Sequence, residues 1–521
     1  MASRVDAGTG DPAGKPATRE VFALGGGAES AYPAAKQAVA PPNRRTARGD
    51  AIDRQPSFLH AALTFCAIVT VIGVGLFGLN ASLHSLMLVC LTIAALSAWL
   101  LYREGFGPIR AAMNTGISGA LPAIYIFVLI GVLIAAFIQA GTVGALIYYG
   151  LQMISPAVFL PTATILCVLM SIATGTSWGT VGTAGIVLIG IGEAIGIPLP
   201  IVAGAIVSGA AFGDKMSPVS DTTNLAAMSA RVDLYGHIRS MTYTTIPTLI
   251  LVLVVFALIN TRYAHNTLPP ERLAALMQAL QGLYHINLLC LLPFAVMIVL
   301  IALKVAAEPA MIAAAAMAAL LAIFMQGADP VAVLNALYGG GSGETGIESL
   351  DNLLSRGGIV SMMWTLSLAL MALALGGILS VFGFLQVLIG AVVRRVRSAF
   401  GLVTATIAGC LVGNMTMGEA YMSIILGGQL FGPAYDDCGV DRRVLSRSLE
   451  EGATLTTGLI PWTTGGAFFA TTLGVSVVDY APWALLNWMN PLVAILFSLL
   501  GIGLFRRHAA PDRAAALAAS D

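Results

Sequence analysis

The chain has 521 residues, of which 57% are hydrophobic and 10% are charged, and its 26 basic side chains balance its 26 acidic ones. A mean hydropathy of +0.87 excludes a soluble globular protein and predicts an all-α polytopic membrane protein surrounded by the lipid bilayer. The zero net charge argues against nucleic acid as a partner. Six scattered cysteines and six histidines form no CxxC or HExxH motif, which argues against a disulfide framework and a metalloprotease.

The N-terminal segment, residues 1–55, is rich in Ala, Gly, Pro and charge and is predicted to be a disordered tail. Arg44, Arg45, Arg48 and Arg54 directly precede the first apolar segment. Because basic residues beside a span stay in the cytoplasm, we expect this tail and the N-terminus to be cytoplasmic.

Apolar segments long enough to enter a bilayer recur along the chain and predict about 10 to 13 crossings or half-crossings. They lie near 59–79, 84–102, 121–140, 157–173, 183–212, 242–260, 286–303, 309–326, 359–393, 400–413 and 483–505. A polar connector at 261–285, with an amphipathic helix expected after Pro270, separates two halves at 56–260 and 286–505, and 506–521 forms a short C-terminal tail.

One stretch carries charge where a membrane helix is expected, FGDKMSPVSDTTNLA at 212–226. A charge near the bilayer centre costs roughly 2.5 kcal/mol or more, so Asp214, Lys215 and Asp221 must face protein or a water-filled cavity. Pro218 donates no amide hydrogen and would free the carbonyl of Asp214 in a helix. Hard cations prefer carboxylate, hydroxyl and carbonyl oxygens, so the stretch predicts a cation site at the two aspartates. The expected oxygen donors are Ser217, Thr222, Thr223 and Asn224.

A solvated loop between two helices is the alternative interpretation of this stretch. It explains individual residues, but it does not explain why so many oxygen-bearing side chains lie between apolar segments.

The stretch has a second copy, because aligning Gly209 with Gly452 also places Pro218 on Pro461, Ser220 on Thr463 and Asp221 on Thr464. Upstream of each copy, another segment of small and polar residues interrupts the apolar sequence, TGTSWGTVGT at 174–183 and GNMTMGEAY at 413–421. We align these two segments by matching Ser177 with Thr416 and Gly179 with Gly418. Two broken or re-entrant helices in each repeated half are typical of a secondary transporter. Close packing of helices through small residues is the alternative. The further candidate ligands are Thr176, Ser177, Glu419, Glu451, Thr456, Thr457, Thr463 and Thr464.

Three segments resemble the NhaC-type Na+/H+ antiporter family, which includes malate/lactate antiporters. They are GTSWGTVGTAG at 175–185, FGDKMSPVSDTTNLA at 212–226 and LSRSLEEGATLTTGLIPWTTGGAFFATTLGV at 445–475. The chain departs from the family pattern at Glu451, Thr463 and Gly465, where Asp, Asn and Cys are expected. The resemblance implies ion-coupled antiport across the bacterial cytoplasmic membrane, halves of inverted topology, and no cofactor beyond the transported Na+ and H+.

Competition at a buried carboxylate suggests the mechanism. Burial favours the protonated carboxylate and an arriving cation favours the ionised one, so Na+ and H+ would exchange at Asp214 and Asp221. Lys215 would be a charge partner of the aspartates or an anchor for an anion.

The closest rival function is Na+- and H+-coupled exchange of malate for lactate. An intramembrane enzyme is a remote alternative, since no Ser/His constellation is present; a passive channel is another. A homodimer is left open.

Overall fold

The computed structural model describes residues 55–505 except 104, 154, 264–269, 304, 342–346, 348–349 and 352–353. The predicted tails, apart from residue 55, lie outside the described residues, as does part of the connector at 261–285.

The regular elements of the described residues are helices, which confirms the all-α class. Eight of these helices are long and apolar enough to cross a membrane, and the number rises to 11 if each of three bent helix pairs is one span. This range overlaps the prediction of about 10 to 13 crossings, so the chain is a multi-pass membrane protein. Two predicted windows each contain two helices, because the chain turns at Gly196 and Gly383, both with positive φ.

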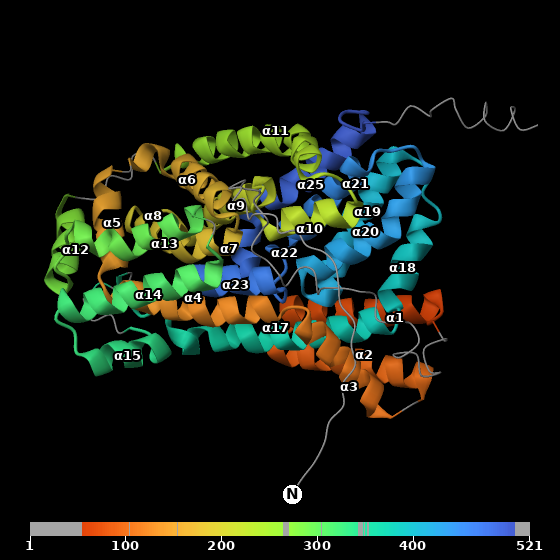
Figure 1. Ribbon diagram of the computed structural model, residues 1–521, viewed down its shortest axis with the longest axis horizontal. Coiled ribbons are helices and arrows are strands. Elements are labelled where there is room, and N and C mark those ends of the chain that lie inside the picture. The colour runs from red at the N-terminus through yellow and green to blue at the C-terminus, as the bar shows by residue number, and fades with distance from the viewer. Residues whose placement is uncertain are drawn as a thin grey trace, which may run out of the picture. The chain divides into compact units, whose positions relative to one another are not determined.

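The first half runs from α1 to α11, and a π-helical segment, η4 (Val181–Gly185), joins α7 to α8 (Figure 1). The helices are α1 (Phe58–Gly73), α2 (Leu83–Tyr102), α3 (Phe106–Ser118), α4 (Leu121–Gln139), α5 (Thr142–Met153), α6 (Phe159–Thr174), α7 (Ser177–Thr180), α8 (Ile186–Ala194), α9 (Leu199–Met216), α10 (Asp221–Ala230) and α11 (Leu234–Asn260).

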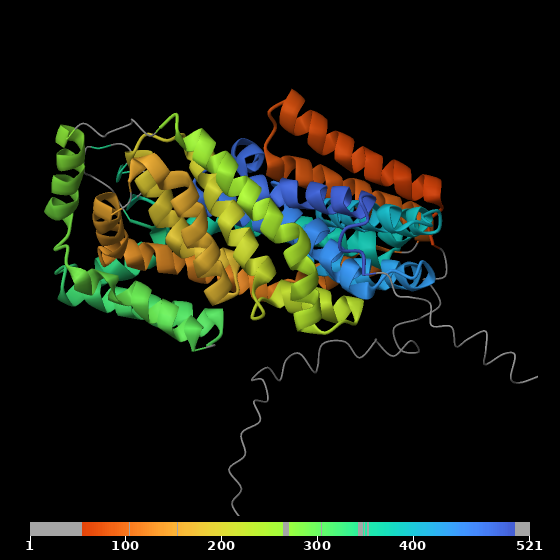
Figure 2. The same cartoon turned by 90° about the horizontal axis from the view of Figure 1, so that it is seen from above.

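The second part of the chain begins with α12, which lies across one end of the helix bundle (Figure 2). Another π-helical segment, η6 (Glu450–Thr454), continues α21 into α22. The helices are α12 (Pro270–Leu283), α13 (Leu292–Ala302), α14 (Ala307–Phe324), α15 (Pro330–Gly339), α17 (Gly358–Val381), α18 (Phe384–Val393), α19 (Ala399–Met417), α20 (Ala420–Asp437), α21 (Arg442–Leu449), α22 (Leu455–Thr457), α23 (Thr464–Leu473), α24 (Val477–Tyr480) and α25 (Leu485–Leu499).

The bounds of the elements repeat with a constant offset of 243 residues (464 minus 221). The offset carries α10 onto α23, the start of α9 onto the start of α21, and the combined α7, η4 and α8 onto α20. It also carries Gly175 onto Gly418, and both glycines end their helices with left-handed φ values of 71° and 67°. The predicted alignment of Gly179 with Gly418 is therefore wrong by four residues. The residue that corresponds to Gly418 is Gly175, because both glycines end a helix.

Equivalent helices of the two halves run in opposite directions. The chain just beyond α25 lies beside the first three turns of α11, where the rings of Tyr243 and Phe505 are 5.2 Å apart. Arg447 Nη1 donates hydrogen bonds to the carbonyls of Ser240, in α11, and Gly503, beyond α25, at 3.2 Å each. The chain beyond α25 therefore passes the first turns of α11. Because α11 and α25 are related by the offset, their antiparallel contact is what an inverted repeat requires.

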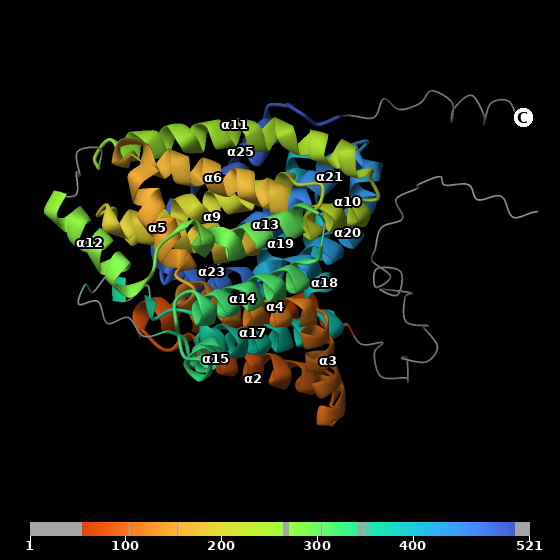
Figure 3. The ribbon, with the colours of Figure 1, turned by 60° about the vertical axis from the view of Figure 1, so that its left-hand side comes forward.

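Helix α9 is the most buried of the eight candidate spans, with 83% of its apolar window buried. It packs on α6 through glycines, since a Cβ at Gly209 would lie 2.3 Å from the carbonyl oxygen of Thr164. Figures 1 and 3 show α11 and α25 on one side of α9, with α2 and α17 at the opposite edge of the bundle. The charged end of α9 is therefore held inside protein.

Candidate functional site

Asp214 is a buried carboxylate at which two helix breaks meet. It lies in the last turn of α9 and is 6% exposed. Its oxygens accept hydrogen bonds from Ser177 Oγ, at the start of α7, and from Ser220 Oγ, just before α10, both at 2.6 Å. Gly175 permits this approach, because a Cβ there would lie 3.1 Å from the amide nitrogen of Ser220. The structure thus joins both interruptions of the first half at one acid.

Helix α9 ends at Met216, two residues before Pro218, where the proline led us to expect a helix break. The carbonyl of Asp214 is not left open, however, because Thr223 Oγ1 donates to it at 3.1 Å and to the carbonyl of Lys215 at 2.9 Å. The Thr223 hydroxyl therefore closes the end of α9 in this state.

Two other predicted cation ligands also make hydrogen bonds to backbone carbonyls near the break between α9 and α10. Ser217 Oγ donates to the carbonyl of Ile172 at 2.9 Å, and Asn224 Nδ2 donates to the carbonyl of Ser220 at 2.7 Å. Thr222 differs, because its hydroxyl lies 3.1 Å from Ser220 Oγ and so extends the Asp214 network.

Asp221 occupies a more accessible position at the start of α10, where its side chain is exposed. One carboxylate oxygen accepts a hydrogen bond from the hydroxyl of Tyr421, in the first turn of α20, and the other accepts from the amide of Thr222 at 2.9 Å. Asp214 and Asp221 interact electrostatically. The second half therefore reaches the first-half site through Tyr421, which was not among the predicted ligands although it lies two positions beyond Glu419.

Glu419 is a buried acid of the second half, 3% exposed, at the N-cap of α20. It accepts hydrogen bonds from the amide of Ala420 at 2.9 Å and from Thr464 Oγ1 at 2.5 Å. The offset of 243 relates it to Thr176, which caps α7 by accepting from the amide of Gly179 at 3.4 Å. Glu419 and Thr464 are thus brought together, and Glu419 interacts electrostatically with Asp221.

The remaining second-half candidates mainly make local contacts. Thr463 caps α23 and donates to the carbonyl of Thr457 at 2.5 Å, close to the break that contains Pro461. Thr456 Oγ1 donates to the carbonyl of Gly452 at 2.6 Å and accepts from Asn414 Nδ2 at 2.9 Å. Within the described residues, the Thr457 hydroxyl makes no hydrogen bond.

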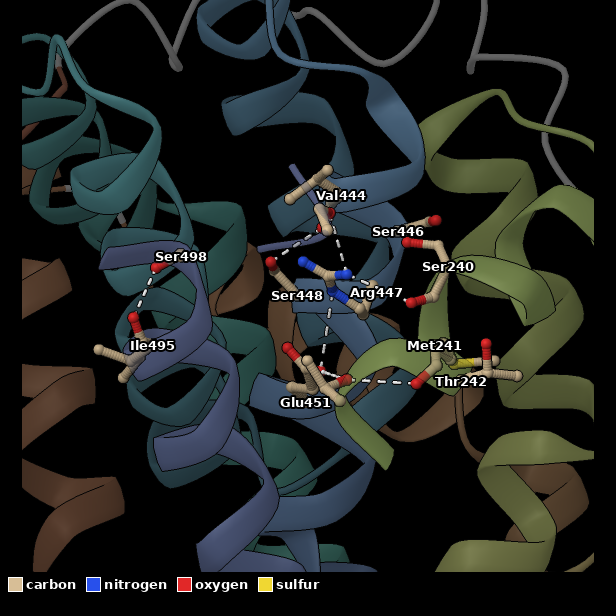
Figure 4. A network of polar contacts seen from close by, with 12 residues as sticks. Ser240, Met241, Thr242, Val444, Ser446, Arg447, Ser448, Glu451, Ile495 and Ser498 are labelled. Carbon is tan, nitrogen blue, oxygen red and sulfur yellow. Dashed lines mark hydrogen bonds and ion pairs between the residues drawn. The ribbon is translucent and has the colours of Figure 1, made fainter. Parts of the chain in front are cut away.

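Lys215 and Glu451 face each other and not the aspartates. Arg447 Nε lies 3.9 Å from Glu451 Oε1 (Figure 4). Lys215 Nζ lies 3.6 Å from the same oxygen, and all three side chains are fully buried. Thr244 Oγ1 donates to that oxygen at 2.6 Å. The charge partner of Lys215 is therefore Glu451 and not, as the sequence suggested, one of the aspartates. Neither Thr244 nor Arg447 was among the predicted site residues, although Arg447 lies in the 445–475 segment that resembles the family.

The acids are not gathered into one metal-binding shell. Among the residues that the structure describes, no group of three or more His, Cys, Asp or Glu side chains could hold a metal ion. A cation at Asp214 would therefore need hydroxyl or carbonyl oxygens, such as those of Ser177, Ser220 and Thr222, to complete its ligands.

A sequence model described as the Na+/H+ antiporter family matches residues 56–260 and 209–502. The chain is 38% identical over 447 residues to the Na(+)/H(+) antiporter NhaC of Alkalihalophilus pseudofirmus, covering 86% of this chain and 96% of that relative. It is 40% identical over 393 residues to the malate-2H(+)/Na(+)-lactate antiporter of Bacillus subtilis, covering 75% and 84%. It is also 34% identical over 477 residues to the arginine/ornithine antiporter ArcD of Halobacterium salinarum, covering 90% and 97%.

Proposed function

This chain belongs to the Na+/H+ antiporter family, and on that premise we propose that it exchanges Na+ for H+ across a membrane at the Asp214 site. The observation that carries the proposal is the buried carboxylate of Asp214, held at the meeting point of two helix breaks by the hydroxyls of Ser177 and Ser220. An intramembrane acid in such a position marks an ion or proton pathway.

Competition for Asp214 would couple the two ions. A proton neutralises the carboxylate directly, whereas Na+ would bind the ionised form together with oxygens of Ser177, Ser220 and Thr222. The hydroxyls of Ser177 and Ser220 can keep donating to the carboxylate while a lone pair of each faces the cation, and the Thr222 hydroxyl lies beside Ser220 Oγ. Asp221, which is exposed, would attract Na+ at the entrance, and Tyr421 would hold its carboxylate when no cation is present.

The remaining parts of the proposal concern the setting of this exchange. The chain acts as a transporter and not as an enzyme, with no cofactor beyond the transported ions. We place it in the bacterial cytoplasmic membrane with its N-terminus in the cytoplasm, because four arginines precede the first span.

Reconstituted liposomes test the exchange directly. With a pH-sensitive dye inside, a Na+ gradient should drive proton movement through the wild type, and Asp214→Asn should abolish it because an amide neither takes up a proton nor neutralises Na+. Asp479→Asn, at an exposed acid of α24, should retain the exchange. Full activity of Asp214→Asn would refute the assignment of the site.

Coupled exchange of malate for lactate is the second candidate function. The buried cations Lys215 and Arg447 favour it, since a carboxylate substrate requires such donors. In the same liposomes, a proton flux that requires malate or lactate would support it over simple Na+/H+ exchange.

A further inference from the structure

A second polar cluster adjoins the Asp214 site. It consists of Lys215, Arg447, Thr244 and Asn490 around the carboxylate of Glu451, and we call it the basic cluster. We propose that the basic cluster is a carboxylate-binding site which the chain's own Glu451 occupies, and that this occupancy restricts the transporter to inorganic cations. The inference rests on the proposed function, which it deepens by defining the substrate class.

The donors of the basic cluster suit a carboxylate. Within it, Glu451 Oε1 receives the Thr244 hydroxyl at 2.6 Å and lies 3.6 Å from Lys215 Nζ and 3.9 Å from Arg447 Nε. With its amide oxygen turned towards Lys215, Asn490 accepts from Nζ at 2.8 Å and so orients the ammonium group. Ammonium, guanidinium and hydroxyl groups together are the usual partners of a bound carboxylate.

Glu451 does not use all the donors that surround it. Arg447 Nη1 donates to the carbonyl of Ser240 (Figure 4) and to that of Gly503. Within the described residues, however, Arg447 Nε and Nη2 make no hydrogen bond, and neither does Glu451 Oε2. A guanidinium can hold both oxygens of a carboxylate side by side. Glu451, tethered one helical turn from Arg447, engages the basic cluster through one oxygen, so the site offers more donors than its occupant takes.

The charges lead to the same conclusion. Lys215, Arg447, Glu451 and the adjacent Glu450 are all fully buried. When Asp214 is neutralised by a proton or by Na+, the two cations balance Glu450 and Glu451 if both of these acids are ionised. Without Glu451, one buried positive charge would be uncompensated, which is strongly destabilising unless an external anion replaces it.

The position of the basic cluster connects it to transport. Lys215 follows Asp214 directly in α9, so a carboxylate bound at Lys215 would lie beside the proposed Na+ site. A site emptied of Glu451 could then hold a substrate carboxylate next to the cation. The side chain at position 451 would therefore decide between cation exchange and carboxylate exchange.

Thermal unfolding of purified Glu451→Ala, with formate and acetate as probes, tests the binding site. In chloride the variant should melt below the wild type, and formate should raise its melting temperature by several degrees in a saturable manner, because a ligand of the folded state stabilises it. The wild type and Glu451→Gln, in which a side chain still fills the space, should show no such rise. If Glu451→Ala can be purified only in formate, the site is equally supported.

A matched control separates a buried anion site from general salt effects. Asp436→Ala removes an acid that pairs with Arg442 at 2.6 Å on the surface, and formate should not stabilise it specifically. Equal responses of Asp436→Ala and Glu451→Ala, or no response of Glu451→Ala to either anion, would overturn the proposal.

Wild-type liposomes provide an independent test of substrate class. Na+-driven proton movement in them reports on the proposed function alone. Labelled lactate and malate should not exchange while Glu451 is in place, so their exchange by the wild type would refute the restriction even if the Na+/H+ activity is confirmed.

Discussion

At the scale of single residues, the hydroxyls of Ser177 and Ser220 control what Asp214 can bind. Each donates to a different oxygen of a carboxylate that is almost entirely removed from solvent. A hydrogen bond to a charged group contributes about 1.5–3 kcal/mol. Loss of either serine should therefore weaken the ionised, cation-binding form of Asp214.

We predict that Ser177→Ala and Ser220→Ala each raise the Na+ concentration for half-maximal proton exchange about tenfold. Dye-loaded liposomes at fixed pH measure this value. Ser498→Ala is the matched control, since its hydroxyl bonds within α25 to the carbonyl of Ile495 at 2.7 Å. Unchanged half-maximal concentrations in both serine variants would show that these hydroxyls are not cation ligands.

The predicted ligands also show the limit of residue-level reasoning. Ser217, Thr223 and Asn224 are hydroxyl or amide residues close to the aspartates, yet each donates to a backbone carbonyl. Thr223 and Asn224 bond within the α9–α10 break, and Ser217 bonds to α6. Ser177, 37 residues before Asp214, contacts it directly. Residue type indicates that an oxygen is available, but not whether the backbone or an acid takes it.

At the scale of elements, the contact of α6 with α9 positions the site. The offset of 243 carries this contact onto α19 and η6, where a Cβ at Gly452 would lie 2.8 Å from Ile407 Cα and Cys410 Cβ. Gly209 makes the equivalent approach to Thr164 and Cys167. Both halves thus use a glycine to bring the interrupted helix against its neighbour.

Gly209→Ala should destabilise the protein by about 1–3 kcal/mol, because the new methyl group must push α9 away from α6. In a helix without such a neighbour, the same change would be stabilising by up to about 1 kcal/mol. Gly73→Ala, with no atom within 4 Å of its Cβ, is the control. Thermal unfolding in detergent compares them, and a Gly209→Ala variant as stable as Gly73→Ala would contradict the packing argument.

At the scale of the whole molecule, the inverted repeat sets the topology. Helices α11 and α25 correspond by the offset and pack in opposite directions. Corresponding ends of the two halves should therefore face opposite sides of the membrane.

Tyr235→Cys and Val478→Cys, 243 residues apart, test this topology in a background without other cysteines. The native side chains are 77% and 41% exposed, so both cysteines should react with a membrane-impermeant maleimide. We expect one to be labelled in right-side-out vesicles and the other in inside-out vesicles. Labelling of both from the same side would exclude an inverted arrangement.

The sequence by itself determined the membrane class, the offset of the second repeat and the charged break at 212–226. These features depend on local composition, since a bilayer requires long apolar helices and excludes unpaired charge. The offset follows from glycines and prolines that match, so the 209–221 segment is enough to find it. Upstream, the alignment of Ser177 with Thr416 matched hydroxyls instead of the helix-ending glycines, and it was therefore wrong.

Only the tertiary structure decided which groups meet. Lys215 pairs with Glu451 and not with its neighbour Asp214, and Tyr421 contacts Asp221 across 200 residues of chain. Such partners are selected by the packing of α9, α11, α20 and α21, whose contacts leave no periodic signal in the sequence. Buried charges must be paired or hydrogen-bonded, but sequence spacing does not specify the partner.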